Sequence, residues 1–472
     1  MRGTMPEQFL IALDIGTSKI GVAVVRRDLH GGFRYVAHGS APSGGMQAGQ
    51  FHDLDAVSTA LRRGLAEAHS LAGATVNDVA LTVGGIRIDA LDLRGSTVFE
   101  RPRDIQVEDV RRAIERAQHP DATGLHPIQR VVQMTLVDGE PVHEAVGRRG
   151  ARLEVSVRDY AISTQTLEQI RTIAGQSGAR IHTFIPAGVA AMTAVTTSME
   201  RASGVAVIDI GASSSDIAVR IGDTQVHVST HAVGGRQITE DLAQVLDIPT
   251  EEAERLKRAH GVVGDAEDEP IDWSPRTIAS LQRQARIGDI PPGAVRGIAQ
   301  ARVIQIIDAL HADLRVAGVM DAIGAGVVIT GGTAQLRGID AMVNAIMRVP
   351  ARVGSPIAGD GFPDVYDPSM SGTLGLARYC AMRAQAEVGA ARRGNVAMGI
   401  VHPAFLGSNS GASWLRPASG QTGTLPVTSM RRANNQHGRT HHGQEAPATR
   451  SVGEQFRGWL REFIPSRDGD QM

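Results

Sequence analysis

Two segments of the chain repeat one pattern of residues that could bind a polyphosphate. Residues 12–25 read ALDIGTSKIGVAVV, and residues 207–220 read VIDIGASSSDIAVR. Each has an apolar run, then Asp-Ile-Gly, then small hydroxyl residues, then a second apolar run. Asp14 and Asp209 are 195 residues apart (209 − 14). The pattern predicts two β-hairpins with glycine and Ser or Thr at their tips.

The residue types at both tips suit phosphate chemistry. Glycine lets the backbone approach phosphate oxygens closely, and successive N–H groups in a tight turn bind anions. Hydroxyl groups add neutral donors, and Lys19 adds a positive charge. Asp14 and Asp209 can each hold Mg²⁺ through its water ligands, because Mg²⁺ dehydrates reluctantly. One such hairpin is often a plain turn, but two copies in the same context favour a nucleotide clamp over two ordinary hairpins.

Two later segments could hold the rest of a nucleotide. Residues 326–339, GVVITGGTAQLRGI, predict a buried strand, a Gly-Gly turn and the start of a helix. Such a glycine pair lets a base and ribose lie against the backbone, although a simple turn is the alternative. Residues 249–261, PTEEAERLKRAHG, have the signals of a short helix. Glu254 and Lys257 share one face of it, where they either bracket an adenosine or form a solvated ion pair.

The composition describes a soluble α/β protein. The 472 residues are 42% hydrophobic and 21% charged, with 54 glycines and 16 aromatic residues (3 + 4 + 9). That length predicts about three domains. A formal net charge of −2 gives no basic field, so nucleic acid is not an expected partner. Cys380, the one cysteine, cannot form an internal disulfide and is expected to be a small buried residue. We find no signal-peptide layout and no membrane-spanning segment.

The C-terminal residues divide into a polar stretch and an amphipathic one. Residues 394–450 are rich in Gly, Ser, Asn, Gln, His and Pro, which predicts a flexible tether. Residues 451–465 then predict a helix, because Ser451 and Glu454 form a capping box. This helix is too short to span a bilayer.

The predicted helix carries one apolar stripe and several arginines. Lying in the membrane interface, it would bury the stripe and turn its arginines toward anionic head groups. The alternative is a terminal helix that docks on its own domain or on a partner. The residues expected to meet the membrane are Val452, Phe456, Arg457, Trp459, Leu460, Arg461 and Phe463.

Taken in order, these motifs resemble the actin/Hsp70/sugar-kinase superfamily. Within it, the chain is most similar to the FtsA family of bacterial actin-like division proteins. The resemblance covers about residues 8–385 and 451–465. The segments that carry it, besides the tail, are ALDIGTSKIGV, VRRAIERAQ, VVQMTLVDGEPV, GRRGARLEVSV, FIPAGVAAM, HAVGGRQITEDLA, LKRAHG, VVITGGTAQLRGI and SGTLGLARY.

The resemblance implies an α/β chain with the actin-like two-domain ATPase fold, with ATP and Mg²⁺ between the domains. It also implies an FtsA-type inserted subdomain, a disordered linker and a C-terminal amphipathic helix. The implied divisions are a first large domain (8–86, 164–203 and 366–385), the inserted subdomain (87–163), a second large domain (204–235 and 306–365), its small subdomain (236–305), the linker (386–450) and the helix (451–465). From the pattern alone, residues 105–118 of the insertion predict a helix, and VVQMTL and LEVSV predict strands.

The family's nucleotide-binding residues carry over by position. The first phosphate loop supplies Asp14, Gly16, Thr17, Ser18 and Lys19, and the second supplies Asp209, Gly211, Ser213 and Ser214. The adenosine is implied to meet Glu254, Lys257, Gly331 and Gly332, and Mg²⁺ is implied to meet Asp14 and Asp209 through water.

The chain departs from the family at two places. The second loop usually reads Asp-Ile-Gly-Gly-Gly-Thr, whereas this chain has Ala212 and Ser213 in place of two glycines. A Cβ there restricts φ and the close approach of phosphate. Hydrolytic relatives place a Glu or Gln near residues 185–188 to orient water, but this chain has Ile-Pro-Ala-Gly. We therefore expect slow or negligible ATPase activity and identify no catalytic residue.

The implied function is an ATP-binding division protein that polymerises and tethers the FtsZ ring to the inner face of the cytoplasmic membrane. Its implied partners are the C-terminal peptide of FtsZ, other copies of itself, anionic lipids, and other division proteins through the insertion. Its place would be peripheral, at the division site. Candidate contacts for the peptide are Arg276, Arg283 and Arg302.

Two other functions stay open. A sugar or carboxylate kinase of the same superfamily would need a catalytic aspartate, which we cannot identify. An ATP-binding adaptor of a pilus or secretion system would share the core but usually not the amphipathic tail.

Overall fold

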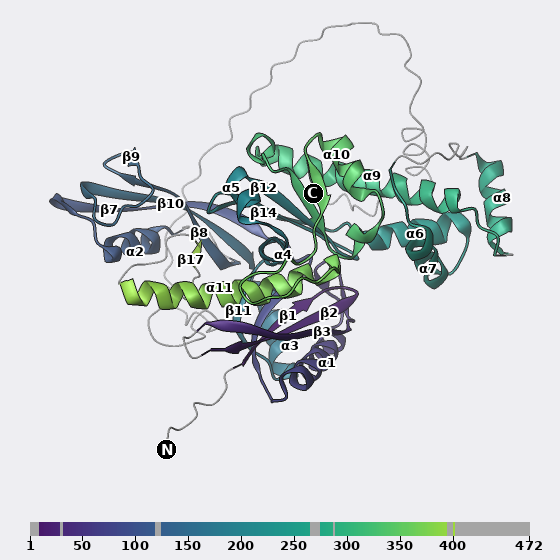
Figure 1. The fold of residues 1–472 in the computed structure, drawn as a ribbon, viewed down its shortest axis with the longest axis horizontal. Helices are drawn as coiled ribbons and strands as arrows, with labels where there is room; N and C mark the ends of the chain where they lie inside the picture. The colour runs from purple at the N-terminus through teal and green to yellow at the C-terminus, as the bar shows by residue number, and fades with distance from the viewer. Residues whose placement is uncertain are drawn as a thin grey trace, which may run out of the picture. The chain divides into compact units, whose positions relative to one another are not determined.

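The structure is a computed structural model that describes residues 9–28, 32–118, 124–264, 274–286, 288–393 and 400–401. The predicted amphipathic helix lies outside these residues. So does the predicted linker, 386–450, except for residues 386–393, which are helical, and 400–401, which form a strand, so the predicted disorder is not observed at these positions. The described chain is mixed α/β, as the sequence predicts (Figure 1). None of the helices that the structure describes is long and apolar enough to cross a membrane.

The strands are β1 (Phe9–Ile15), β2 (Lys19–Arg27), β3 (Phe33–Pro42), β4 (Met46–Gln47), β5 (Gln50–Phe51), β6 (Asp78–Val83), β7 (Asp89–Asp104), β8 (Leu125–Val137), β9 (Glu140–Pro141), β10 (Arg149–Ser163), β11 (Arg180–Phe184), β12 (Val205–Ile210), β13 (Ser215–Ile221), β14 (Thr224–His231), β15 (Val327–Thr330), β16 (Ala351–Val353) and β17 (Ile400–Val401). The α-helices are α1 (Leu54–Ala72), α2 (Val107–Arg116), α3 (Thr164–Ser177), α4 (Ala187–Val195), α5 (Ser198–Ser203), α6 (Gly235–Leu246), α7 (Thr250–His260), α8 (Pro275–Arg286), α9 (Pro292–Val316), α10 (Ile339–Met347) and α11 (Ser371–Arg393). The 3₁₀ helices are η1 (Met320–Ala322), η2 (Gly332–Gln335) and η3 (Pro368–Met370).

Two five-stranded sheets share one topology. The first has the order β11-β6-β1-β2-β3, and the second, read in the same direction, has the order β16-β15-β12-β13-β14. In each, an antiparallel meander begins with the strand that carries the repeated Asp-Ile-Gly, and two parallel strands follow. Both predicted hairpins are therefore confirmed, and the repeat extends from the hairpin to the whole sheet.

The repeat holds at the level of single residues. Asp14 lies opposite Gly21 in the antiparallel pair and beside Thr82 in the parallel pair. Asp209 lies opposite Asp216 and beside Thr330 in the same two relations. The two aspartates thus lie one residue before the ends of equivalent central strands, one in each sheet.

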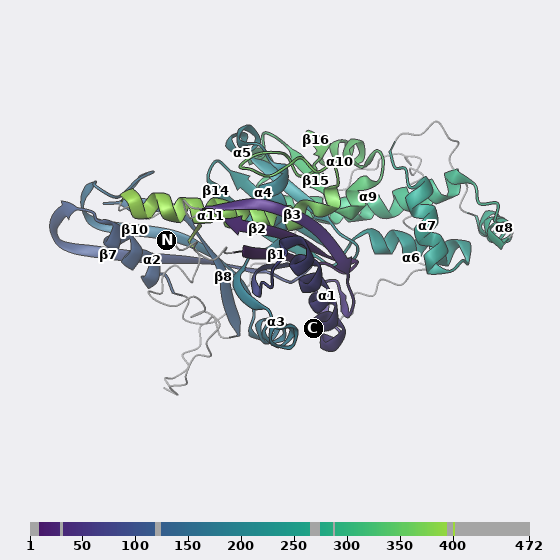
Figure 2. The same ribbon diagram turned by 60° about the horizontal axis from the view of Figure 1, so that its bottom comes forward.

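Two helices, α4 and α11, pack between the sheets. Apolar residues of α11 and Ala190 of α4 share a core with β1, β2 and β6 of the first sheet. Other apolar residues of α4, among them Val189, Met192 and Val195, pack on β12, β13, β14 and β15 of the second sheet. A Cβ at Gly375 would lie 1.7 Å from the Ala190 carbonyl oxygen, so glycine is required where the two helices cross. On the other face of the first sheet lie α1 and α3 (Figures 1 and 2).

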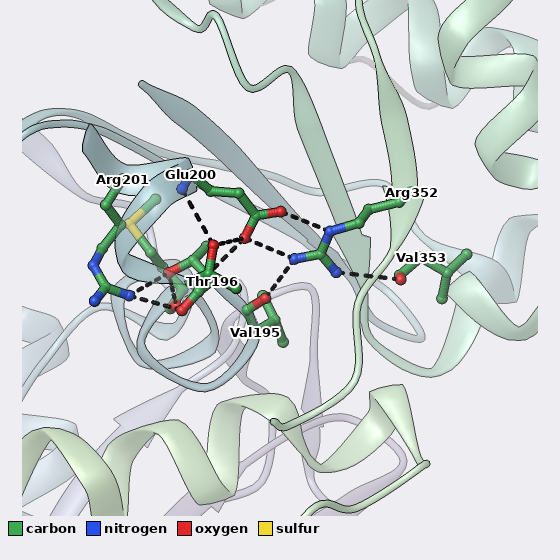
Figure 3. Close-up of polar contacts among 8 residues, drawn as sticks. Val195, Thr196, Glu200, Arg201, Arg352 and Val353 are labelled. Carbon is green, nitrogen blue, oxygen red and sulfur yellow. Dashed lines mark hydrogen bonds and ion pairs between the residues drawn. The ribbon is translucent and has the colours of Figure 1, made fainter. Parts of the chain in front are cut away.

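Polar contacts fix the C-terminal end of α4 to the second sheet (Figure 3). Arg352 of β16 pairs with Glu200 of α5 at 2.7 Å and donates to the Val195 carbonyl oxygen at 2.7 Å. Arg201 donates to the Thr196 carbonyl oxygen at 2.7 Å. These bonds satisfy carbonyl groups that the end of the helix leaves without partners.

A third sheet is built mainly from the predicted insertion, and residues 400–401 add β17 at its edge. Its strand order is β17-β8-β10-β7, and β9 pairs with β8. The predicted helix over 105–118 is observed as α2, and the two predicted strands form parts of β8 and β10. Apolar residues of α2, β7 and β10 form a separate core for this part of the chain. One buried ion pair in this part of the chain joins Arg130 and Asp159 at 2.6 Å.

Candidate functional site

The two predicted phosphate loops have the same backbone geometry. Gly16 N–H donates to the Lys19 carbonyl oxygen at 3.0 Å, and Gly211 N–H donates to the Ser214 carbonyl oxygen at 2.8 Å. The loop tips touch each other, because Thr17 Oγ1 and Ser213 Oγ are 2.5 Å apart. The fold therefore brings together two segments that lie 196 residues apart along the chain.

The two replaced glycines cause no backbone strain in the second loop. Neither Ala212 nor Ser213 has a positive φ, so neither needs the left-handed conformation that favours glycine. The expected restriction on φ does not arise. Any effect of the extra side chains must come from the space they fill and the bonds they make.

Each repeated aspartate lies against a glycine that leaves it room. A Cβ at Gly372 would lie 2.4 Å from Asp14 Oδ2, and a Cβ at Gly331 would lie 2.2 Å from Asp209 Oδ1. Gly331 also has a φ of +88°, so both space and conformation require glycine there. Thr373 Oγ1 donates to Asp14 Oδ2 at 3.3 Å. The starts of η2 and α11 thus close around the ends of the two central strands.

The aspartates form an electrostatically unfavourable group, because their carboxylates are buried close to one another. Burial raises the pKa of Asp14 to about 6, although Lys19 and Thr373 oppose this. Burial, followed by the charges of Asp14 and Asp216, raises the pKa of Asp209 well above its usual range. A cation placed near these carboxylates would lower all of these pKa values. Within the described ranges, no three His, Cys, Asp or Glu side chains are arranged to hold a metal ion.

Asp216 belongs to this group and was missed by sequence reasoning. It is 5% exposed and accepts hydrogen bonds from Gly85 N–H at 3.1 Å and Thr230 Oγ1 at 2.8 Å. Burial raises its pKa to about 7. The hairpin pattern could have identified this residue. A hairpin with its tip at residues 212–213 pairs Asp209 with Asp216 across the two strands, which places both side chains on one face of the sheet.

Replacing Asp216 with asparagine is expected to stabilise the ligand-free chain at pH 8 and to have much less effect near pH 4. Between these values the unfolded chain releases this proton while the folded chain retains it, so the free energy of unfolding falls as pH rises. This decrease in the free energy of unfolding of the unmodified chain levels off above about pH 7 and amounts to on the order of 2–4 kcal/mol. Urea unfolding at pH 4, 6 and 8 measures it. The exposed Asp321→Asn is the control, and parallel pH profiles for Asp216→Asn and the unmodified chain would contradict the expectation.

Lys19 does not extend freely over its loop. Its ammonium donates to Ser369 Oγ at 2.6 Å and contacts Met370 Sδ at 3.2 Å, both in η3. Ser18, by contrast, is exposed at the tip of the first loop. The positive charge expected for phosphate is thus held between the first loop and η3.

The predicted ion pair on α7 is not a solvated surface pair. Lys257 is 14% exposed and lies 2.6 Å from Glu254. Its ammonium also donates to the Gly235 carbonyl oxygen at 3.0 Å and to Thr239 Oγ1 at 2.9 Å, both on α6. Burial lowers the pKa of Lys257, and the contact with Glu254 opposes this.

The start of α6 connects this ion pair to the other site segments. Gly235 N–H donates to the Gly211 carbonyl oxygen of the second phosphate loop at 3.0 Å. Thr333 Oγ1 of η2 donates to the same carbonyl oxygen at 2.8 Å. The second phosphate loop, the α6–α7 pair and the Gly331–Gly332 turn therefore form one connected unit. A Cβ at Gly332 would meet no atom nearer than 3.9 Å, so space is open above that residue.

The start of α4 has no group that could orient water. Ile185 and Ala187 are buried apolar residues, and Pro186 lies directly before the helix. A Cβ at Gly188 would lie 2.9 Å from the Ile217 carbonyl oxygen, so the segment packs tightly on β13.

Of the three arginines predicted to bind a partner peptide, Arg302 is engaged within the fold. Its guanidinium makes two bonds to the buried carboxylate of Asp241, at 2.6 and 2.7 Å, and is 18% exposed. The geometry therefore does not favour Arg302 as a peptide contact. Arg276 and Arg283 of α8 are exposed. The predicted membrane-binding residues, 452–463, lie outside the described residues.

Comparisons with known proteins confirm the resemblance that the motifs predict. The family model described as "Cell division protein FtsA" matches residues 206–375. The FtsA cell division protein of Pseudomonas aeruginosa is 28% identical over 390 residues, which cover 80% of this chain and 91% of that protein. The FtsA cell division protein of Bacillus subtilis is 29% identical over 383 residues, covering 80% of this chain and 84% of that protein.

A solved structure shares the fold. A chain of a PilM-PilN type IV pilus biogenesis complex superposes with a TM-score of 0.50 over 79% of this chain and 98% of its own length. The two sequences are 17% identical, so this likeness concerns the fold alone. The predicted actin-like α/β fold is confirmed.

Proposed function

Because the chain is a relative of the FtsA cell division proteins over four fifths of its length, we propose that it is an ATP-binding, actin-like division protein. In this proposal it polymerises and tethers the FtsZ ring to the inner face of the cytoplasmic membrane. The proposal that the chain binds a nucleotide rests on one observation. Two equivalent loops of glycine and hydroxyl residues meet, with Thr17 Oγ1 and Ser213 Oγ 2.5 Å apart. Two such loops facing each other give a polyphosphate donors from both sides.

The residues present fit a nucleotide with Mg²⁺. Backbone N–H groups of the two loops would bind the phosphates, together with loop hydroxyls other than that of Ser213, and Lys19 would add charge. Asp14 and Asp209 would hold Mg²⁺ through its water ligands. Such a site needs only one or two carboxylates, because Mg²⁺ keeps several of its waters and also binds phosphate oxygens. The raised pKa values of both carboxylates support a bound cation, because its charge would relieve their burial. Adenosine would lie over Gly332 beside Glu254 and Lys257.

The nucleotide would act mainly by being bound. The start of α4, residues 185–188, offers no carboxylate or amide to orient an attacking water. Without such a group the loops position phosphate but do not activate the nucleophile, so we infer that hydrolysis is slow or negligible. In this account ATP stabilises the form of the chain that polymerises.

The tether is proposed from the sequence pattern at residues 451–465. Five apolar residues recur at helical spacing, with arginines on the flanks, and this pattern is typical of helices that lie in a membrane interface. One short helix binds weakly, whereas a polymer presents many of them at once and gains avidity. Anionic lipids are the favoured surface, because the arginines gain from negative head groups.

The remaining partners follow from the same relationship. The small subdomain of residues 236–305 would take the acidic C-terminal peptide of FtsZ, with Arg276 and Arg283 as exposed contacts. The inserted subdomain, residues 87–163, would contact other division proteins or further copies of the chain. The protein would thus act peripherally at the division site.

The two alternatives are less well supported. A sugar or carboxylate kinase would need a catalytic aspartate for its acceptor. Three aspartates near the loops, Asp14, Asp209 and Asp216, would in this proposal lie beside the phosphates and not beside an acceptor. A pilus or secretion adaptor is favoured only by the fold shared with the pilus complex. The sequence relatives at 28–29% identity favour the division protein instead.

The proposal predicts that the chain carries FtsZ polymers onto vesicles. FtsZ assembled with GTP should sediment with anionic lipid vesicles only when this chain and ATP are present. A chain that ends at residue 450 should bind FtsZ polymers without bringing them to the vesicles. Co-sedimentation measures both species, and FtsZ recruitment that is equal with and without residues 451–472 would contradict the tether.

A further inference from the structure

The Ser213 hydroxyl joins three segments of the chain at one point. It lies 2.5 Å from Thr17 Oγ1 and accepts a hydrogen bond from Ala48 N–H at 2.7 Å. Ser213 is 3% exposed, so these bonds are shielded from water. Thr17 and Ala48 both come from the part of the chain that carries the first sheet, whereas Ser213 lies in the second hairpin.

Ala48 is held in place by its own surroundings. It lies in the turn between β4 and β5 with a φ of +49°, next to Gly49 with a φ of +74°. A non-glycine residue in this conformation is strained, and it persists when neighbouring contacts hold it there. Gly49 supplies such a contact, because a Cβ on it would lie 1.8 Å from the Gly85 carbonyl oxygen. The N–H group of Ala48 is therefore a fixed donor for Ser213.

The present contact leaves no room for a phosphate oxygen between the two loop tips. Two hydroxyls that both donate to one phosphate oxygen need to lie roughly 4–5 Å apart, since each hydrogen bond is about 2.7 Å long. Thr17 and Ser213 are 2.5 Å apart and bond to each other instead. A phosphate held from both sides must first separate them.

We propose that Ser213 is a latch that holds the two phosphate loops together in the ligand-free chain and is displaced by a nucleotide phosphate. The latch consists of Ser213, Thr17 and Ala48 N–H. The inference rests on the proposed binding of a nucleotide at these loops, but it concerns how the site opens. Glycine, the residue that the resemblance to FtsA leads one to expect at position 213, has no hydroxyl and could form neither bond.

The latch competes with the ligand, so removing it strengthens binding. Ser213→Ala should lower the dissociation constant for ATP by about twofold to tenfold, the range that one net hydrogen bond corresponds to. Without nucleotide, the same change should speed hydrogen exchange at the Ala48 amide by about threefold to tenfold, because that donor loses its acceptor. Ser213→Gly should behave in the same way.

A neighbouring serine provides a matched control. Ser215 lies in the same hairpin, and its hydroxyl donates to the Val233 carbonyl oxygen at 2.8 Å, away from the latch. Ser215→Ala removes the same group from the same hairpin and should leave exchange at Ala48 unchanged. Titration of the full chain with a fluorescent ATP analogue and amide exchange over residues 45–52 are the two measurements.

The two measurements separate the latch from the proposed function. If the unmodified chain binds no ATP, the proposed nucleotide function fails, while amide exchange still tests the latch. Weaker ATP binding by Ser213→Ala would overturn the latch and make Ser213 a phosphate ligand. Unchanged exchange at Ala48 in both Ser213 variants would overturn it as well.

Discussion

Replacing Gly332 with leucine is expected to weaken ATP binding by roughly 100-fold or more while leaving the thermal midpoint nearly unchanged. Gly332 has an ordinary φ, and a Cβ there would meet nothing nearer than 3.9 Å, so the fold itself tolerates a side chain. The leucine would fill the space in which the proposal places the ribose and base. Titration with a fluorescent ATP analogue, together with a thermal melt of the same variant, measures both effects.

The neighbouring glycine and a smaller substitution serve as controls. Gly332→Ala adds only a methyl group into open space and should change ATP affinity far less than leucine does. Gly331→Ala should destabilise the fold, because its Cβ would lie 2.2 Å from Asp209 Oδ1 at a φ of +88°. If Gly332→Leu binds ATP as tightly as the unmodified chain, the adenosine does not lie over this turn.

Replacing both Phe456 and Trp459 with aspartate is expected to reduce binding to anionic vesicles by at least about 20-fold. Burying one large apolar side chain contributes roughly 1.5–3 kcal/mol, and each added carboxylate is repelled by the anionic surface. Both residues lie on the predicted stripe, at positions that share a face in a helix. Co-sedimentation with vesicles that contain anionic lipid measures the bound fraction.

Trp414→Asp is the matched control for the tail. It makes the same chemical change as the single substitution Trp459→Asp, in the C-terminal region, but lies outside the predicted stripe. Its binding to vesicles should equal that of the unmodified chain. Equal losses for Trp414→Asp and Trp459→Asp would show that general hydrophobicity, and not the stripe, brings the chain to the membrane.

The parts of the site that sequence predicts are those encoded locally. The Asp-Ile-Gly repeat predicts both hairpins because a strand, a tight turn and a second strand need only neighbouring residues. The Glu254–Lys257 pair follows in the same way from helical spacing. These segments form as predicted, and the comparisons bear out the fold that their order implies.

The parts that sequence misses depend on contacts between distant segments. No local pattern marks Ala48 as a donor to Ser213, since the two are 165 residues apart. The raised pKa of Asp216 depends on its burial, and its bond from Gly85 spans 131 residues. The position of Asp216 could nonetheless have been predicted, because the register of the hairpin places it opposite Asp209.

Arg302 was predicted as a partner contact because its pairing with a distant residue cannot be seen in the local sequence. An arginine in a helical sequence reads as a solvated or partner-binding charge when its neighbours are considered alone. Its partner, Asp241, lies 61 residues earlier, on α6, and only the packing of α6 on α9 brings the two together. The candidates for the FtsZ peptide are reduced to Arg276 and Arg283 for this physical reason.

Nucleotide bound at the two loops is expected to control how well the tail holds the FtsZ ring at a membrane. The most direct measurement is the amount of FtsZ polymer that sediments with anionic vesicles, with and without ATP, for the unmodified chain and for Gly332→Leu. We predict that ATP raises the vesicle-bound FtsZ severalfold for the unmodified chain and leaves it low for Gly332→Leu. Equal, ATP-independent recruitment by both chains would contradict the claim.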